Sequence, residues 1–172
     1  IEADSLNSAL LLPDAAPGTE AFELLVAEVV REMTVKSGQK CTAIRRVFVP
    51  QACFDAAAEA IGARLARITV GNPRNETVRM GSLVSREQLA SVREGLAVLC
   101  GQTDVLHDGG SHALVEADPA VAACIGPTLL GARDPGAAAR VHDTEVFGPV
   151  ATLMPYRSLD EALALVRRGE GS

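Results

Sequence analysis

Short apolar runs alternate along this chain with longer stretches whose apolar residues recur every three or four positions. The short runs predict buried strands at residues 9–12, at 43–50 and at the end of 141–156. The longer stretches predict helices, which cover residues 17–38, 51–70, about 86–100 and 158–172. Strands and helices in alternation favour an α/β fold of three layers, in which a mostly parallel sheet carries helices on both faces.

Local signals place several helix ends. Thr19 is a suitable N-cap for the first predicted helix, and Gly38 is placed to end that helix. Ser158 and Glu161 have the spacing of a capping box at the start of the last helix. Short strands are also expected within the turn-rich segment 103–136. The predicted buried helix faces consist of Phe22, Val26, Val29, Val30 and Met33 in the first helix, and of Phe54, Ala58, Ile61, Leu65 and Ile68 in the second.

Composition narrows the functions that such a fold could have. A length of 172 residues suits one domain or one lobe of a larger fold. The net charge of -6 and the aromatic content of 3% argue against a nucleic-acid surface. No apolar run is long enough to cross a bilayer. We therefore expect neither a nucleic-acid partner nor a membrane partner.

The four cysteines and three histidines show no metal-binding pattern. The cysteines form no Cys-x-x-Cys pair and the histidines fall at no metal-ligand spacing, so no metal site is expected. A largely apolar chain without a visible secretion signal is typical of the cytoplasm, where disulfides are rare. For Cys53, Cys100 and Cys124, the helical or apolar settings favour small buried side chains over reactive thiols.

Cys41 is the exception, because it lies between a glycine turn and an apolar run. Its thiol could be accessible there, the following backbone N–H groups could bind an oxyanion, and the neighbouring Lys40 could favour the thiolate. A thiol nucleophile also needs a base or a lowered pKa. The residues leave three candidate bases open, which are His107, His142 and Glu2. A buried, inert Cys41 and an ordinary surface Glu2 also remain open at this point.

Four blocks of sequence resemble the aldehyde dehydrogenase superfamily, in the order found in that family. Residues 37–50, "SGQKCTAIRRVFVP", resemble its cysteine signature, and residues 1–15 resemble the strand that carries its catalytic glutamate. Residues 70–85 resemble its loop leading to Met-Gly-x-Leu and a serine. Residues 144–156, "TEVFGPVATLMPY", resemble its Glu-x-Phe-Gly-Pro-Val segment. One Gly-x-x-Cys would be weak evidence, but four ordered blocks cover almost the whole chain.

The resemblance implies an NAD(P)-dependent enzyme and a role for each matched residue. Cys41 matches the nucleophile, which attacks an aldehyde to give a thiohemiacetal and, after hydride transfer, a thioester. Glu2 matches the general base that activates water to hydrolyse this thioester. Glu145 matches the glutamate that contacts the nicotinamide ribose, and Phe147 matches the phenylalanine beside the nicotinamide.

One departure resembles a particular branch of the family. Glu2 is followed by "ADSLN" instead of Leu-Gly-Gly-Lys, and the interval from Glu2 to Cys41 is longer than usual. Both features resemble the aldehyde dehydrogenase domains that are fused to a hydratase domain in the ring-opening enzymes of phenylacetate degradation. That branch implies a CoA-linked semialdehyde as the substrate, a carboxylic acid as the product and NADP as the cofactor.

The resemblance also implies that residues 1–172 form a partial catalytic domain, with the cofactor-binding domain absent from this chain. We expect a homo-oligomer for the full-length protein and little turnover by the fragment alone. Two alternatives stay open. The chain could be a non-catalytic interaction or oligomerisation fragment of the same fold, or a thiol hydrolase that uses Cys41 with a histidine.

Overall fold

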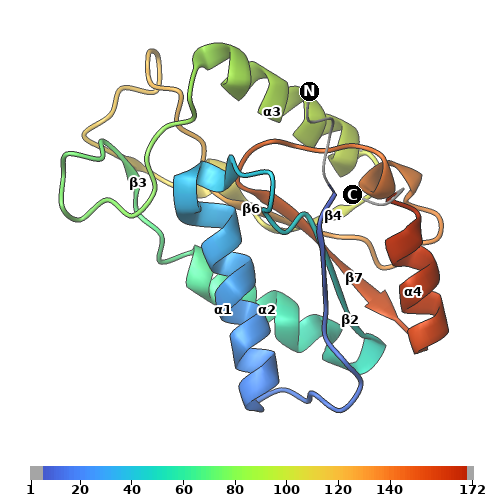
Figure 1. The fold of residues 1–172 in the computed structure, drawn as a ribbon. Helices are drawn as coiled ribbons and strands as arrows, with labels where there is room; N and C mark the ends of the chain where they lie inside the picture. The colour runs from blue at the N-terminus through green and yellow to red at the C-terminus, as the bar shows by residue number, and fades with distance from the viewer. Residues whose placement is uncertain (1–5, 170–172) are drawn as a thin grey trace.

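One five-stranded sheet organises the computed structural model, which describes residues 6–169 (Figure 1). Its strand order is β1-β2-β7-β6-β4. β4 runs antiparallel to β6, whereas the other neighbours are parallel, so the prediction of a mostly parallel sheet is confirmed. The strands are β1 (Ser8–Leu10), β2 (Arg46–Pro50), β4 (Asp104–His107), β6 (Thr128–Gly131) and β7 (Val150–Tyr156), and a separate parallel pair consists of β3 (Val70–Gly71) and β5 (Leu114–Val115).

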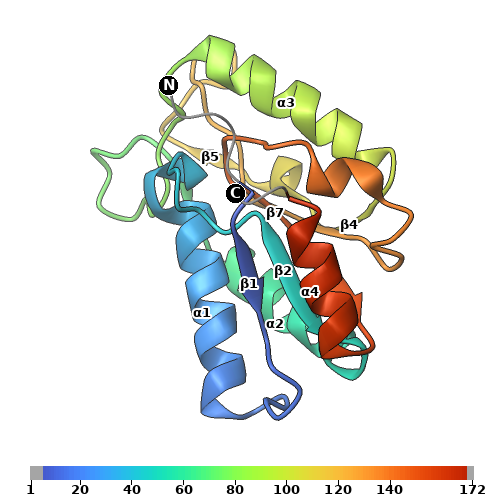
Figure 2. The same ribbon diagram turned by 45° about the vertical axis from the view of Figure 1, so that its right-hand side comes forward.

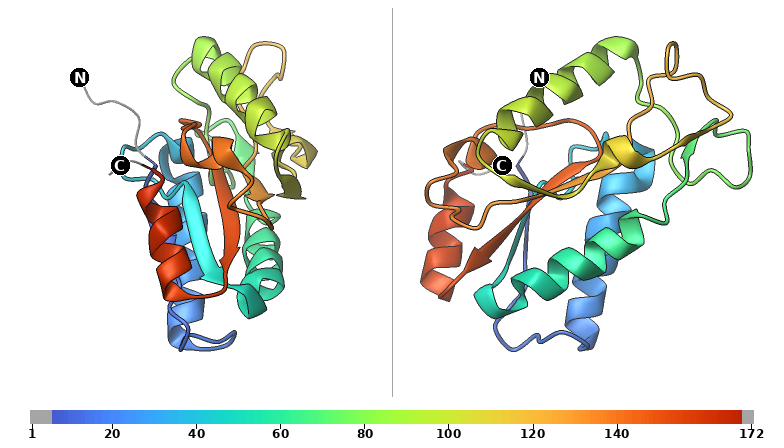
Figure 3. Two further views of the ribbon diagram at one scale, coloured as in Figure 1. Left: turned by 90° about the vertical axis from the view of Figure 1, so that its right-hand side faces the viewer. Right: turned by 180° about the vertical axis from the view of Figure 1, so that it is seen from behind.

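Helices cover both faces of this sheet, which confirms the three-layer prediction. Because side chains alternate along a strand, β2 directs Val47 into one core and Phe48 into the other. Val47 packs with α1 (Glu20–Thr34) and α2 (Phe54–Leu65). Phe48 belongs to the core formed with α3 (Arg86–Cys100) and α4 (Leu159–Arg167). Figure 2 shows α4 beside β2, and the left panel of Figure 3 shows β2 and β7 between α4 and α2.

The first helix begins as predicted but ends earlier. Thr19 caps α1, because its hydroxyl accepts a hydrogen bond from the N–H of Phe22 at 3.4 Å. The helix stops at Thr34 and a short 3₁₀ segment, η1 (Val35–Gly38), follows. Within η1, Lys36 and Ser37 have φ angles of 54° and 55°, which non-glycine residues rarely adopt. Backbone strain is therefore concentrated in the segment that leads to Cys41.

Two other boundaries differ from the sequence prediction. The strand expected at 43–50 begins only at Arg46, because the N–H groups of Arg45 and Arg46 both donate to the carbonyl of Asn7. The helix expected at 51–70 covers only α2, which follows the 3₁₀ turn η2 (Gln51–Cys53) and ends before the chain enters β3. Its buried face consequently includes Ala57 instead of Ala58.

The remaining helices follow the sequence closely. α3 covers the predicted residues, and Ser158 caps α4 by accepting a hydrogen bond from the N–H of Glu161 at 3.2 Å. The final helix is shorter than the predicted 158–172, because α4 ends at Arg167 and residues 168 and 169 form a turn. Residues 170–172 lie outside the described residues. Among residues 6–169, every helix is too short or too polar to cross a lipid bilayer.

Candidate active site

Cys41 lies on an exposed turn between η1 and β2. The side chain of Asn7, just before β1, holds this turn. Its Nδ2 donates to the carbonyl of Cys41 at 2.6 Å and to that of Ala43 at 3.2 Å. A described residue of the predicted glutamate block is thus joined directly to the cysteine turn.

The loop at residues 81–84 supports the same turn from a second side. Ser37 donates its hydroxyl to the carbonyl of Gly81 at 2.9 Å. Gln39 accepts a hydrogen bond from the N–H of Val84 at 3.0 Å and donates its amide to the carbonyl of Lys36. The structure therefore brings together the cysteine block and the Met-Gly-x-Leu block, although more than 40 residues separate them in sequence.

A close glycine contact joins the turn to a third block. Gly38 has a φ of +70°, and a Cβ atom there would collide with the carbonyl of Gly148. Only glycine satisfies both the backbone conformation and the close approach. As a result, the turn that carries Cys41 packs against the segment that contains Glu145 and Phe147.

Arg45 spans this junction and is buried beneath it. Its Nη1 donates to the carbonyl of Gly148 at 2.7 Å, and its Nη2 donates to that of Gly38 at 2.8 Å. Its Nε lies 3.4 Å from Oε1 of Glu145, and the two side chains are only 4% and 8% exposed. Burial lowers the pKa of Arg45, while the charge of Glu145 opposes this shift. Sequence reasoning missed Arg45, because its partners come from other segments.

Phe147 is the exposed member of the 145–148 segment, with 37% of its surface accessible. Its ring lies 5.5 Å from the Arg45 guanidinium. Its carbonyl accepts a hydrogen bond from the side chain of Gln88, in the first turn of α3, at 2.8 Å. Gln88 was also missed, although its position just after the 70–85 block was the available signal.

Lys40 does not stand beside the thiol as an unpaired cation. Its Nζ lies 2.6 and 2.7 Å from the two carboxylate oxygens of Glu32 on α1, so its charge is neutralised there. The structure also reduces the number of N–H groups that could bind an oxyanion beside Cys41. The N–H of Ala43 already donates to the carbonyl of Lys40 at 3.1 Å, so an oxyanion would have to be bound by other N–H groups.

The histidines considered as bases bind elsewhere. His142 is buried, with Nδ1 3.3 Å from Arg46 and Nε2 2.8 Å from the carbonyl of Pro135, so both ring nitrogens are engaged. Burial lowers the pKa of His142. His107 lies on the edge strand β4, where its Nε2 is 3.1 Å from Nε2 of His112, and burial lowers its pKa as well. These contacts disfavour a cysteine–histidine hydrolase.

The other cysteines differ from one another. Cys53 and Cys124 are buried, as predicted, and burial raises the pKa of the Cys124 thiol. Cys100 is exposed at the end of α3, which corrects the expectation of a buried side chain. Its pKa is nevertheless raised, mainly by desolvation and also by the charge of Asp108. None of the four cysteines forms a disulfide within residues 6–169.

The predictions about Glu2 and about a metal site are tested only as far as the described residues allow. Glu2, the predicted general base, lies outside the described residues. Among residues 6–169, no group of three or more His, Cys, Asp or Glu side chains could hold a metal ion.

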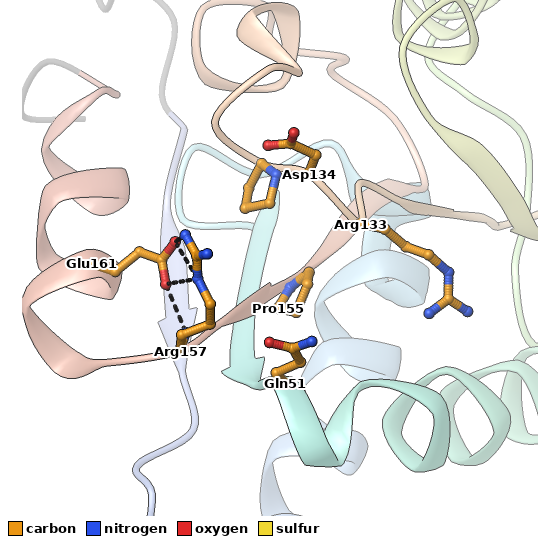
Figure 4. A pocket seen from close by; sticks show the side chains of 7 residues that line it. Gln51, Arg133, Asp134, Pro155, Arg157 and Glu161 are labelled. Carbon is orange, nitrogen blue, oxygen red and sulfur yellow. Dashed lines mark hydrogen bonds and ion pairs between the residues drawn. The ribbon is translucent and has the colours of Figure 1, made fainter.

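A polar hollow of about 310 Å³ lies at the opposite end of the sheet, where β2 and β7 finish. Arg157 points to Glu161, with Nη2 2.7 Å from Oε1, while Arg133 points away from both (Figure 4). Arg133 instead pairs with Asp55. Because the two cations diverge and each already has a carboxylate partner, this hollow lacks the convergent polar groups of a binding site.

Comparisons with known proteins extend these observations. Residues 4–169 match the aldehyde dehydrogenase family. The chain is 56% identical to 3,4-dehydroadipyl-CoA semialdehyde dehydrogenase from Aromatoleum evansii, over 100% of this chain and 34% of that protein. It is 29% identical to hydroxyisobutyraldehyde dehydrogenase from Mycolicibacterium austroafricanum, over 99% of this chain and 32% of that protein. The chain thus spans about a third of the length of these relatives.

Solved structures share the fold. Betaine aldehyde dehydrogenase from Staphylococcus aureus, in complex with NAD+, superposes with a TM-score of 0.79 at 24% identity, over 94% of this chain and 30% of that one. Methylmalonate-semialdehyde dehydrogenase from Oceanimonas doudoroffii gives a TM-score of 0.80 at 20% identity, over 94% of this chain and 32% of that one.

Proposed function

This chain belongs to the aldehyde dehydrogenase family, and we propose that it supplies the nucleophile-bearing part of an NAD(P)-dependent aldehyde dehydrogenase. The observation that carries the proposal is the packing of Gly38 against Gly148. This contact joins the exposed Cys41 turn to the segment that contains Glu145 and Phe147. This packing supports the proposal, because it brings the turn of the proposed nucleophile beside the residues matched to cofactor binding.

The proposed reaction begins with the Cys41 thiolate. Its sulfur attacks the aldehyde carbon, and the resulting thiohemiacetal oxygen is stabilised by nearby N–H groups. A nicotinamide held at Glu145 and Phe147 would supply the hydride acceptor for this carbon, and Cys41 would then carry a thioester. Glu2 then takes a proton from the water that attacks the thioester carbon. The carbon–sulfur bond breaks, which releases the carboxylic acid and returns the thiolate.

The residues matched to the cofactor are compatible with that role. The exposed ring of Phe147 offers an apolar face on which a planar nicotinamide can pack. A carboxylate has about four acceptor positions, so Glu145 can accept a ribose hydroxyl while Arg45 contacts its Oε1. We propose NADP or NAD as the cofactor, and no metal. The ribose-binding role of Glu145 and the nicotinamide contact of Phe147 are part of this proposal.

The substrate proposal rests on the resemblance of sequence. The relative from Aromatoleum evansii is a CoA semialdehyde dehydrogenase and is 56% identical to this chain. We therefore propose a small aldehyde linked to CoA, formed in phenylacetate degradation and oxidised in the cytoplasm. Residues 1–172 would be part of a catalytic domain, with cofactor binding completed by a separate domain and with a homo-oligomeric full-length protein.

Replacing the nucleophile in the complete protein tests the central claim. Cys41→Ala should lower aldehyde-dependent NAD(P) reduction by about 10⁴-fold or more, the scale seen when a nucleophile is removed. Cys100→Ala is the matched control, because Cys100 is also exposed, and it should retain activity. Equal losses in both variants, or an active Cys41→Ala, would contradict the proposal and favour a non-catalytic fragment.

Replacing the proposed base tests the second step separately. Glu2→Gln should still form the thioester in a single turnover, but should hydrolyse it about 10²-fold or more slowly. Rapid-quench trapping of the acylated protein measures both steps. An unchanged steady-state rate would remove Glu2 from the mechanism and leave the role of Cys41 intact.

A further inference from the structure

We propose that Arg45 is a positioning residue that fixes the cofactor-contacting segment 145–148 against the Cys41 turn. The inference rests on the proposed function, since it assigns Glu145 and Phe147 to the cofactor. Arg45 is assigned this role because it contacts both the Cys41 turn and segment 145–148.

Arg45 contacts both sides of the junction at once. One guanidinium nitrogen donates to Gly38, three residues before the nucleophile, and another donates to Gly148, directly after Phe147. Both bonds are shorter than 2.9 Å and both are buried. The carbonyls of the two segments are therefore held by a single rigid group.

The side chains of the segment are held as well as its backbone. Nε of Arg45 lies 3.4 Å from the Glu145 carboxylate, and the guanidinium lies 5.5 Å from the centre of the Phe147 ring. A planar guanidinium can make these contacts simultaneously, whereas a lysine ammonium is a point charge on a flexible stem. Arg45 consequently orients the two residues that are matched to the cofactor.

The Cys41 turn has other supports, but the described side-chain bonds to segment 145–148 come from few residues. Asn7 bonds to the carbonyl of Cys41, and Ser37 and Gln39 bond to the backbone of Gly81 and Val84. On the opposite side, Gln88 holds the carbonyl of Phe147. Loss of Arg45 should therefore disturb the relative position of the two segments more than it disturbs the turn itself.

The experiment compares Arg45→Lys with Arg46→Lys in the complete protein. Arg46 is the matched control, because it is also buried but donates to Leu6, Leu165 and Val166, outside the junction. Three quantities are measured: Tm, the Kd for NADP by fluorescence titration, and the rate of Cys41 alkylation by iodoacetamide with and without NADP.

We expect Arg45→Lys to raise the Kd for NADP about tenfold, which is the effect of losing one charge-assisted hydrogen bond. Alkylation of Cys41 without cofactor should stay within about twofold of wild type, because the turn keeps its other supports. The difference between the Cys41 alkylation rates with and without NADP should be smaller in Arg45→Lys than in wild type. Arg46→Lys should lower Tm and leave the Kd within about twofold.

A Kd for Arg45→Lys within twofold of wild type, or an equal rise in both variants, would overturn the inference. If Arg45→Lys does not fold, Arg45→Gln combined with Glu145→Gln removes both buried charges. That double variant should bind NADP at least about threefold more weakly than Glu145→Gln alone, and equal affinities would also overturn the inference. The proposed function fails on a different result, namely wild-type protein that binds NADP but oxidises no aldehyde.

Discussion

Arg45 and Arg46 are adjacent in sequence, are both buried, and serve different parts of the molecule. Arg45 lies at the Cys41 junction and contacts a carboxylate, that of Glu145. Arg46 binds a different set of segments, because it donates to carbonyls in the segment before β1 and at the end of α4. Its side-chain contacts are with the ring of His142 and with the ring of Phe48, whose centre lies 5.7 Å from the guanidinium.

The difference shows two ways of burying a guanidinium. Carbonyls at a helix C-terminus carry partial negative charge, which suits a cation but does not fully compensate for lost water. Burial accordingly lowers the pKa of Arg46 to about 10. The Arg45 region contains a full opposite charge and adjoins the exposed Cys41 turn. Arg46 connects the segment before β1 to the end of α4. Arg45 connects the Cys41 turn to segment 145–148 of the proposed active site.

The largest expected effect is a difference in the free energy of unfolding between variants of Arg45 and variants of Arg46. Arg45→Met leaves the Glu145 carboxylate buried beside an apolar side chain, which should lower the free energy of unfolding by about 3–5 kcal/mol. Arg46→Met leaves carbonyls without donors but no buried charge, so about 2–3 kcal/mol is expected. Urea unfolding measures both values.

A double variant sharpens this first prediction. Adding Glu145→Gln to Arg45→Met should restore part of the lost stability, because it removes the buried charge that has lost its contact with Arg45. If the double variant is no more stable than Arg45→Met, the ion pair is not the reason for the difference between the regions.

Glycine substitutions give the next largest effect. At Gly38 a Cβ would meet the backbone of Gly148, and φ is +70°, so Gly38→Ala should cost about 3 kcal/mol. In the Arg46 region, a Cβ at Gly169 would meet the tip of the Arg46 side chain, which should shift at a cost of about 1–2 kcal/mol. Thermal unfolding compares them.

Gly18→Ala is the control for backbone conformation alone. Gly18 has a φ of +88° but no heavy atom within 4 Å of an added Cβ, so only about 1 kcal/mol is expected. A Gly38→Ala variant as stable as Gly18→Ala would mean that the contact with Gly148 is not restrictive.

Acidification should destabilise the Arg46 region through His142. Burial, with the charges of Arg168 and Arg46, lowers the pKa of His142, although a bond to Pro135 and the charge of Asp143 oppose this. Below pH 6.5, the unfolded state takes up a proton that the folded state does not. Stability should thus fall as the pH drops from about 6.5 to the folded pKa, by at most about 1.4 kcal/mol per pH unit.

His142→Gln tests this assignment. The variant should have a shallower loss of stability between pH 7.5 and 5.5 in urea unfolding, with a residual slope from His107, whose pKa is also lowered by burial. An unchanged slope would exclude His142 as a source of the pH dependence.

The smallest effect is expected for the exposed arginines. The Arg157 side chain is 78% exposed beside Glu161, and Arg133 is 59% exposed beside Asp55. Because exposed ion pairs contribute little, Arg157→Ala and Arg133→Ala should each change stability by less than about 1 kcal/mol. A loss comparable to that of Arg46→Met would mean that exposure does not distinguish these arginines from the buried pair.

Much of the secondary structure was predictable because its causes are local. The Thr19 and Ser158 caps, the extent of α3 and the buried strand around Val47 follow from residue types and their spacing. The errors concern segments where distant contacts override propensity. η1 leaves the helical path at Lys36 because Ser37 and Gly38 bind other loops.

The candidate site was predictable only through the motifs. The local setting singled out Cys41, but its reaction and the roles of Glu145 and Phe147 came from resemblance, and all of these roles remain proposals. Local reasoning about Lys40 failed to foresee that its ammonium binds Glu32 on the preceding helix. Asn7 carried no recognisable local signal, and Gln88 carried only its position just after the 70–85 block. The atoms they bind belong to segments 34 and 59 residues away.

The sequence by itself determined the α/β class, the helix faces and caps, and the family, because periodicity, capping and motifs are written in neighbouring residues. Only the tertiary structure decided that Arg45 belongs to the Cys41 junction while Arg46 belongs to α4. The two arginines have nearly identical sequence surroundings. Their side chains leave the start of β2 in different directions, so their partners are chosen by which distant segments pack there.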